Sequence, residues 1–224
     1  MHRELRISLV IPCYNEEKGI RQVLSRVPRQ VDEVVVVDNA STDRTALVAA
    51  SLGARVVRES RRGYGAAYKA GLPAATGDIV ITLDGDGSYP PEEIPRLVDL
   101  LVERGWDFLS ARRFPLADPR AMPWSNRLGN QVLTWATALL FRTPIRDSQS
   151  GMWVFRRALL ATLRLTSDGM AFSEEIKLET LLRGFRFGEE HVSYGLREGD
   201  VKLRKWRDGW GNLTFLVRKR LGRV

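Results

Sequence analysis

Cysteine and long hydrophobic runs are the features that this 224-residue sequence has least of. Cys13 is the only cysteine, so no intramolecular disulfide can form and a zinc site built from cysteines has too few ligands. A reducing cytoplasm suits such a chain. No apolar stretch approaches the roughly 20 residues that span a bilayer, and the N-terminus has no apolar signal segment. We therefore expect a cytoplasmic protein without a transmembrane segment.

The composition favours a folded protein with anionic partners. Hydrophobic residues make up 44% of the chain and charged residues 28%, which is enough apolar material for one core. We expect residues 1–224 to form a single domain, because the length is short for two. The formal net charge of +8 indicates nucleic acid, an anionic lipid surface or phosphorylated small molecules as partners. Charge alone does not choose among them.

Short β-branched runs alternate with helical patterns through the first half of the sequence. This alternation predicts an α/β fold with a mostly parallel sheet covered on both faces. The expected strands are residues 7–11, 34–37, 54–57, 79–83 and 107–110, and the expected helices are residues 17–27, 43–52, 65–75 and 92–104. The second half is less regular, with helices expected at 124–141 and 174–183, a loop at 147–151, a strand at 187–194 and a basic tail.

Two carboxylates follow the expected strand 79–83. Asp84 and Asp86 are separated by Gly85, whose small size lets a ligand approach the backbone. Carboxylates in this place suit Mg²⁺ or Mn²⁺, which bind proteins through one or two such groups together with substrate phosphates. The alternative is an acidic turn, because Asp-Gly pairs are common in hairpins.

A second acidic segment follows the strand 34–37. Asp38 ends a run of four valines and precedes no helix directly, so we interpret it as a ligand residue. Asp43 stands before the helical pattern 43–52, and we interpret it as a helix cap. In parallel sheets, ligands gather at the carboxyl ends of the strands, where both segments lie.

Four segments resemble, in order and spacing, the signature of glycosyltransferase family 2. They are Ile-Pro12-Cys-Tyr14-Asn-Glu16-Glu, Val-Asp38-Asn39-Ala-Ser-Thr-Asp, Arg62-Gly63-Tyr-Gly-Ala-Ala and Leu-Asp84-Gly85-Asp86. Later segments are similar to those of dolichyl-phosphate or polyprenyl-phosphate mannose and glucose synthases: Ser110-Ala-Arg112, Asn126-Arg127-Leu-Gly-Asn130, Asp147-Ser-Gln-Ser150-Gly151 and Arg197-Glu-Gly199-Asp-Val-Lys202-Leu. The resemblance implies a Rossmann-like, three-layer GT-A fold. It also implies inverting transfer of mannose or glucose from a GDP- or UDP-hexose to polyprenyl or dolichyl phosphate.

The same resemblance implies roles for individual residues. It implies that the nucleobase and ribose lie among Pro12, Tyr14, Glu16 and Asp38, with Asn39, Gly63 and Gly85 in the same substrate-binding motifs. It implies diphosphate and metal binding by Asp84 and Asp86, lipid-phosphate binding by Arg112 and Arg127, and donor-phosphate binding by Arg197 and Lys202. Two positions depart from the mannose synthases, Ser88 in place of a glutamine and Val201 in place of a serine. These departures leave the donor sugar and base open.

The acceptor decides whether a catalytic base is needed. A phosphomonoester is largely ionised near neutral pH and attacks without a strong base. A hydroxyl acceptor requires a carboxylate base, for which Asp147, Glu174 and Glu175 are the candidates. We expect Asp147 to organise the acceptor loop. The alternative for the two glutamates is the first turn of a helix capped by Ser173, where the helix dipole favours acids.

Residues 203–224 combine tryptophans, aliphatic residues and cations in the manner of an interfacial helix on anionic headgroups. The segment 124–141 supplies a second candidate lipid-facing stripe, for which an ordinary core helix is the alternative; its members are Trp124, Trp135, Leu139, Leu140 and Phe141. We expect peripheral contact with the cytoplasmic face of a membrane. A nucleic-acid-binding module is a remote alternative, because the strand-end carboxylates repel a phosphate backbone.

Overall fold

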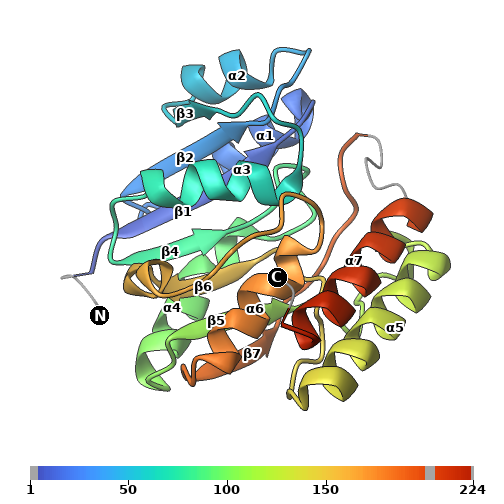
Figure 1. The fold of residues 1–224 in the computed structure, drawn as a ribbon. Helices are drawn as coiled ribbons and strands as arrows, with labels where there is room; N and C mark the ends of the chain where they lie inside the picture. Colours follow the sequence, from blue (N-terminus) through green and yellow to red (C-terminus); the bar gives the residue numbers. More distant parts are fainter. Residues whose placement is uncertain (1–4, 200–204, 223–224) are drawn as a thin grey trace.

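The computed structural model describes residues 5–199 and 205–222, which form a seven-stranded sheet with helices on both faces (Figure 1). The strand order across the sheet is β3-β2-β1-β4-β6-β5-β7. The strands are β1 (Ile7–Cys13), β2 (Glu33–Asp38), β3 (Arg55–Arg58), β4 (Ile79–Thr82), β5 (Phe108–Arg112), β6 (Trp153–Arg156) and β7 (Phe187–His191). The α-helices are α1 (Glu17–Ser25), α2 (Thr45–Ser51), α3 (Tyr64–Gly71), α4 (Ile94–Glu103), α5 (Trp124–Phe141), α6 (Phe172–Leu182) and α7 (Lys205–Arg220).

The mostly parallel sheet that the sequence predicts is confirmed. Strands β1 to β4 pair in parallel, and so do β5 and β7. Strand β6 was not predicted; it lies antiparallel between β4 and β5. It is only four residues long and Trp153, Val154 and Phe155 are all fully buried, so the sequence has no alternation of apolar and polar residues to reveal it.

Apolar side chains on both faces of the sheet explain why its strands are nearly continuous β-branched runs. Leu9 and Ile11 face the layer of α1, α2 and α4, whereas Val10 faces α3 and α6. The three-layer prediction is therefore confirmed. Because parallel strands end at the same edge, the segments that follow them lie together, and Cys13 at the end of β1 pairs with Asp38 at the end of β2.

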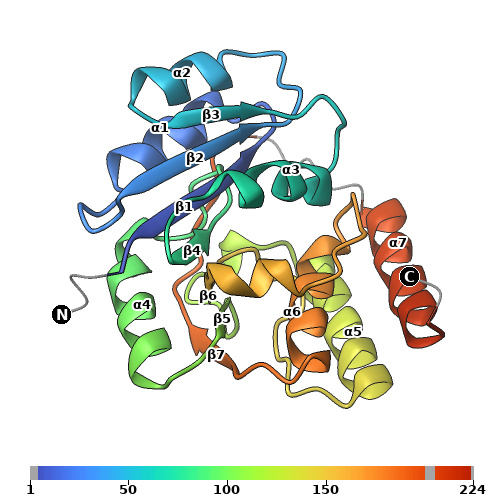
Figure 2. The same cartoon turned by 60° about the vertical axis from the view of Figure 1, so that its left-hand side comes forward.

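Helices α5 and α7 lie side by side at one edge of the fold, next to α6 (Figures 1 and 2). Ile145, Leu178 and Leu216 form a small separate core there. Lys219 of α7 contributes a nearly buried ammonium that lies 2.7 Å from a carboxylate oxygen of Glu179 in α6. The C-terminal helix is thus anchored to the body of the protein by both apolar and ionic contacts.

The segment 124–141 combines the two alternatives that its sequence leaves open. On one side of α5, Leu140 and Phe141 pack against the small core between α5, α6 and α7. On the other side, Trp124, Trp135 and Leu139 have exposed fractions of 74%, 71% and 82%. The helix is therefore a core element with an exposed apolar face.

Candidate active site

A cavity of about 800 Å³ opens at the carboxyl ends of β1, β2 and β4. We call the side formed by the segments after these strands the strand-end wall, and the opposite side, formed by Arg113, α5 and α7, the helix wall. The volume of the cavity lies in the range of pockets that hold small ligands and cofactors. Among the residues singled out from the sequence, those that line it are Pro12, Tyr14, Glu16, Asn39, Gly63, Asp84, Gly85, Asp86 and Arg197.

The carboxylates of Asp84 and Asp86 form the centre of the strand-end wall. Asp84 accepts a hydrogen bond from the Tyr64 hydroxyl at 3.2 Å. Burial, and secondarily the charge of Asp86, raise the pKa of Asp84 to about 7. A Cβ atom on Gly151 would lie 3.0 Å from both Asp84 carboxylate oxygens, so only glycine leaves room beside this group.

Ser88, a buried residue beside the cavity, forms two hydrogen bonds with the carboxylate of Asp86. Both its backbone N–H and its hydroxyl donate to the same Asp86 oxygen, at 3.0 and 2.6 Å, and the serine is buried. The other Asp86 oxygen lies 3.3 Å from the guanidinium of Arg197, which also lies 3.5 Å from Glu16. Ser88 therefore orients Asp86 and leaves one of its oxygens facing a cation.

The acidic pair fits a divalent metal ion. Two adjacent carboxylates supply hard oxygen ligands, and a cation beside Asp84 would offset the burial and the Asp86 charge that raise its pKa. Within the described residues, no group of three or more His, Cys, Asp or Glu side chains could hold a metal alone. A metal ion held here would complete its coordination with water and substrate phosphate oxygens, as Mg²⁺ commonly does.

Asn39 lines the strand-end wall, but its amide is already occupied. The amide nitrogen donates to the carbonyl oxygens of Glu59 and Arg61, and its oxygen accepts from the backbone N–H of Gly63. Asp38, next to it, is half-buried, accepts from the Ser41 N–H at 3.1 Å and does not line the cavity. Asp43, which we interpreted as a helix cap, stands one residue before Arg44, the N-cap of α2, but its carboxylate accepts from the N–H of Thr45 at the start of the helix.

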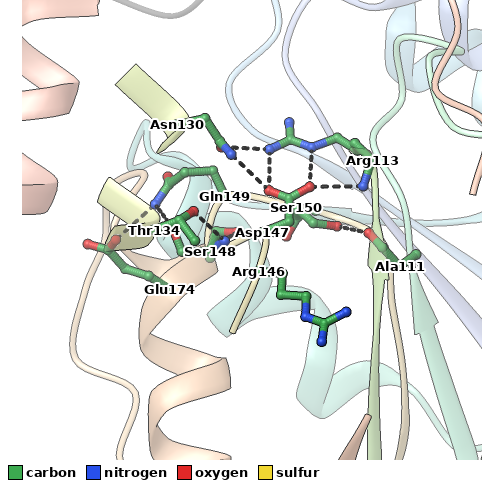
Figure 3. A network of polar contacts seen from close by, with 12 residues as sticks. Ala111, Arg113, Asn130, Thr134, Arg146, Asp147, Ser148, Gln149, Ser150 and Glu174 are labelled. Carbon is green, nitrogen blue, oxygen red and sulfur yellow. Dashed lines mark hydrogen bonds and ion pairs between the residues drawn. The ribbon is translucent and has the colours of Figure 1, made fainter. Parts of the chain in front are cut away.

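A buried ionic network stands behind the helix wall (Figure 3). Nε and one terminal nitrogen of Arg113 donate to the two oxygens of Asp147 at 2.9 and 2.8 Å. Asn130 of α5 bonds to both partners. Burial alone would raise the pKa of Asp147, but Arg113 and then Lys177 overcome this effect and hold it at about 2. Asp147 is therefore a permanent anion that orients the guanidinium.

One edge of Arg113 remains available. Its second terminal nitrogen points away from Asp147 in Figure 3 and makes no hydrogen bond with the described residues. The side chain is only 9% exposed, yet it lines the cavity. A buried guanidinium with free donors is a strong site for a phosphate oxygen.

The resemblance assigned the lipid phosphate to Arg112 and Arg127, but neither residue lines the cavity. Arg112 ends β5 opposite His191 of β7 and does not line the cavity. Arg127 donates to the carbonyl oxygens of Met122 and Pro119, which holds the chain before α5. The alternation of side chains along a strand is the signal that could have identified Arg113. Arg113 continues the face of Leu109 and Ala111, whose side chains pack with α1 and α4. Lys202 and Val201 lie outside the described residues.

The loop 147–151 is held from below by α6. The ammonium of Lys177 donates to the carbonyl oxygens of Asp147, Ser148 and Ser150, each at 2.9 Å. The alternative for Glu174 and Glu175 holds in part: both stand in the first turn of α6, but the helix begins at Phe172, so Ser173 is not its cap, and the Ser173 hydroxyl donates to the Ser150 carbonyl. The sequence motif around Asp147 gave no sign of Lys177, which comes from a distant helix.

The two glutamates of α6 that were candidate bases, Glu174 and Glu175, are buried and do not line the cavity. Glu174 accepts from the amide of Gln149 at 2.8 Å, and burial raises its pKa well above its usual value. Glu175 accepts from the backbone N–H groups of Thr166 and Ser167 and so fixes the loop before α6. Cys13 belongs to the buried core of the sheet, and burial raises the pKa of its thiol.

An α/β fold with a cavity at the ends of its parallel strands, and with an acidic pair in the wall of that cavity, is typical of enzymes that bind a nucleotide there. The chain belongs to glycosyl transferase family 2, whose family model matches residues 8–164. It is 40% identical over 193 residues to a glycosyltransferase of Mycobacterium tuberculosis, covering 86% of this chain and 87% of that protein. It is 34% identical over 206 residues to a dolichyl-phosphate hexose transferase of Haloferax volcanii, covering 91% and 89%.

Solved structures agree with this family. The glucosyl-3-phosphoglycerate synthase of Mycobacterium tuberculosis, in complex with Mg²⁺ and UDP, matches with a TM-score of 0.78 and 26% identity over 99% of this chain and 81% of that one. Its complex with Mn²⁺, UDP and glucosyl-3-phosphoglycerate matches with a TM-score of 0.77. The GT-A fold expected from the sequence is thereby confirmed, and the protein is a glycosyltransferase.

Proposed function

We propose that this glycosyltransferase moves a hexose, mannose or glucose, from a UDP- or GDP-hexose to polyprenyl or dolichyl phosphate, with inversion at the anomeric carbon. The similarity to a dolichyl-phosphate hexose transferase along 91% of the chain supports the lipid phosphate acceptor. The complexes of glucosyl-3-phosphoglycerate synthase with UDP and Mg²⁺ or Mn²⁺ support a nucleotide donor and a divalent metal.

The donor diphosphate belongs at the strand-end wall in this proposal. Asp84 and Asp86 would hold Mg²⁺ or Mn²⁺ there, and a divalent ion at this place would neutralise the charge that develops on the departing diphosphate. Arg197 lies 3.3 Å from Asp86, close enough to contact the same phosphate oxygens. We also assign Lys202 to these phosphates, and Pro12, Tyr14 and Glu16 to the nucleoside.

The acceptor phosphate belongs at the helix wall, and the free edge of Arg113 is the observation that carries this proposal. Arg113 is buried, is fixed by Asp147 and Asn130, and keeps two N–H donors free for an anion. Its guanidinium also lowers the pKa of Asp84, so its charge reaches the metal-binding pair across the cavity. In this place Arg113 takes the role that the sequence resemblance gave to Arg112.

The positions of the candidate bases also favour a phosphate acceptor. A hydroxyl acceptor would need a carboxylate base in the cavity, and none of the three carboxylates considered from the sequence lies there. Asp147, Glu174 and Glu175 are fully buried, and none of them lines the cavity. Asp168 and Asp208 do line it, but Asp168 forms an ion pair with Lys69 and Asp208 lies 3.7 Å from Arg207. A phosphate that is already ionised attacks the anomeric carbon without either group. The reaction then depends on positioning and on charge neutralisation.

Peripheral contact with an anionic membrane is part of the same proposal. The apolar side chains Trp124, Leu128, Trp135 and Leu139 follow one face of α5 and are 52% to 82% exposed. Trp210 and Val217 form a similar stripe on α7, with the exposed arginines Arg218 and Arg220 nearby. In the same region, Ser125 and Asn126 of α5 and Gly209 and Asn212 of α7 line the cavity, so a lipid held at this face has its phosphate close to Arg113.

No helix within the described residues combines the length and the hydrophobicity needed to cross a bilayer. Contact through α5 and α7 is therefore proposed as interfacial, with the apolar stripes in the headgroup region and the arginines on anionic lipids. Cosedimentation with vesicles tests it: Trp135→Ser combined with Leu139→Ser should weaken binding to anionic vesicles. Leu47→Ser, at a 70% exposed position on α2, is the matched control and should bind as the unchanged protein does.

The acceptor is tested by a competition between substrate classes. Labelled UDP-glucose and GDP-mannose are each incubated with the protein, Mn²⁺ and vesicles that contain polyprenyl phosphate, or with phosphoglycerate or free sugars instead. We expect label in the lipid phase, with the opposite anomeric configuration to the donor. Label found only in water-soluble products would overturn the lipid acceptor and leave the donor assignment standing.

A further inference from the structure

Lys177 of α6 places a buried ammonium group against the loop 147–151. Its Nζ donates to the carbonyl oxygens of Asp147, Ser148 and Ser150, each at 2.9 Å. The lysine is fully buried and does not line the cavity. An ammonium group has three donors and no acceptor, so this one loop uses all the hydrogen bonds that the side chain can make.

The two ends of the loop belong to the two walls of the cavity. At its start, the carboxylate of Asp147 binds the guanidinium of Arg113 on the helix wall (Figure 3). At its end, Gly151 lies beside Asp84 on the strand-end wall, where a Cβ atom would come within 3.0 Å of both carboxylate oxygens. The loop therefore connects the group proposed for the acceptor phosphate with the group proposed for the metal ion of the donor.

The two ends of the loop are held in different ways. The Ser150 carbonyl accepts from the Ser173 hydroxyl at 2.8 Å and from the Trp153 indole at 2.7 Å, so it keeps two donors without Lys177. The Asp147 carbonyl has Lys177 as its only side-chain donor among the described residues. The position of Asp147 relative to Ser150 therefore depends on the ammonium group that both carbonyls share.

We propose that Lys177 is a positioning residue, which sets the distance between Arg113 and Asp84 and so between the acceptor phosphate and the anomeric carbon of the donor. The inference rests on the proposed function, because it requires an acceptor phosphate on the helix wall and a metal-bound donor on the strand-end wall. Reaction needs the attacking and attacked atoms about 3 to 3.5 Å apart, so a shift of about 1 Å in the loop slows catalysis without removing either binding site.

Other roles fit Lys177 less well. An apolar side chain of similar size would fill the same space without the cost of burying a charge, but it would leave the loop carbonyls short of donors. A catalytic base must reach a proton of the substrate, whereas the Lys177 ammonium lies outside the lining of the cavity and its donors point into the loop. The hydrogen bonds therefore favour control of the loop geometry.

The test separates binding from catalysis in Lys177→Met, which fills similar space without a charge or a donor. Steady-state assays give kcat and the apparent KM for prenyl phosphate and for UDP-glucose or GDP-mannose, whichever the unchanged protein uses. Isothermal titration gives the affinity for UDP with Mn²⁺. We expect kcat to fall roughly 10- to 100-fold, because both substrates bind but are misaligned. Both KM values and the UDP affinity should change by no more than a few-fold.

Thr180→Val is the matched control, because Thr180 is also buried on α6 and its hydroxyl donates to the carbonyl oxygen of Ile176 in the same helix. It should keep the kcat of the unchanged protein. Thermal unfolding shows whether Lys177→Met is folded. If it is not, Lys177→Gln retains two donors on an amide and should show the same pattern with a smaller fall in kcat.

The outcomes distinguish this inference from the proposed function. Transfer to prenyl phosphate by the unchanged protein, together with an unchanged kcat in the folded Lys177 variants, would overturn the positioning role alone. A rise in the KM for prenyl phosphate that accounts for the whole loss of activity would also overturn it, since Lys177 would then only shape the acceptor site. No transfer to prenyl phosphate by the unchanged protein would instead refute the proposed function, and this inference with it.

Discussion

On the strand-end wall of the cavity, the polar groups follow directly on β1, β2 and β4, so the sheet itself sets their positions. On the helix wall, Arg113, Asn130 and Asp147 come from the end of β5, from α5 and from the loop before β6. These three residues meet only in the folded chain. The first wall is positioned by backbone, and the second by a buried network of charges.

This difference predicts how each wall responds to mutation. A change at the strand-end wall removes a ligand and leaves the fold, because Asp84 and Asp86 carry no part of the core. A change at the helix wall removes a counterion from a buried partner, so it affects stability and function together.

The largest effect is expected at the metal-binding pair. Asp86→Ala should lower kcat roughly 100- to 1000-fold, because the departing diphosphate loses the cation that neutralises it. The midpoint of thermal unfolding should stay close to that of the unchanged protein. Steady-state assays in saturating Mn²⁺, alongside Asp118→Asn at a surface ion pair, measure this effect. Full activity of Asp86→Ala would refute metal binding at this residue.

Breaking the buried pair on the helix wall should cost stability. Arg113→Met leaves Asp147 charged and buried with no guanidinium, and the free energy of unfolding should fall by about 3 to 5 kcal/mol. Combining it with Asp147→Leu removes the unpaired charge and should restore part of that loss in urea denaturation. The apparent KM for prenyl phosphate should stay high in both variants. A double variant no more stable than Arg113→Met would contradict the ionic account.

The contrast between the walls also explains which parts of the molecule could be predicted from sequence. Asp84 and Asp86 are adjacent in the chain, so a local motif contains their whole arrangement. The choice between Arg112 and Arg113 depends on which face of β5 each side chain takes, and the strand expected at residues 107–110 ends before both of them. Strand β6, the antiparallel partner of β5, is short and buried on both faces, so it carries no pattern of its own.

Long-range contacts account for what the sequence could not reveal elsewhere. Lys177 lies 27 residues or more from the loop carbonyls that it binds, and no local signal links them. Asn39 belongs to a recognised motif, yet its amide holds the backbone around Arg62. Motif resemblance therefore locates residues near a site, whereas the hydrogen bonds determine which of them are free to contact a ligand.

The pH dependence of metal binding is a smaller effect at the strand-end wall. Mn²⁺ requires ionised carboxylates, and the pKa of Asp84 is raised to about 7. Protonation competes with the metal below this pH, so Mn²⁺ affinity should fall by up to tenfold per pH unit between pH 7 and pH 5 and level off above pH 8. Titration of Mn²⁺ in the presence of UDP measures it. In Asp84→Asn this proton is absent, and the slope should flatten.

The smallest effect is expected where α7 meets the loop of the helix wall. The amide of Asn212 donates to the side-chain oxygen of Gln149 at 2.8 Å, and both residues line the cavity. Asn212→Ala should lower the free energy of unfolding by about 1 kcal/mol, because one buried hydrogen bond is lost while the anchor between Lys219 and Glu179 remains.

Asn212→Ala should affect binding of the acceptor at the helix wall and leave binding of the donor at the strand-end wall unchanged. Gln149 is also held by Glu174, so the loop shifts little, and the apparent KM for prenyl phosphate should rise only a few-fold, within the effect of one hydrogen bond. The affinity for UDP with Mn²⁺ should not change, because no residue of the strand-end wall bonds to Asn212 in the described part of the chain. Thr214→Ala is the control, because the Thr214 hydroxyl donates only to the carbonyl oxygen of Gly211 in the same helix. Equal losses for donor and acceptor in Asn212→Ala would mean that α7 closes the whole cavity, and that the two walls are not independent.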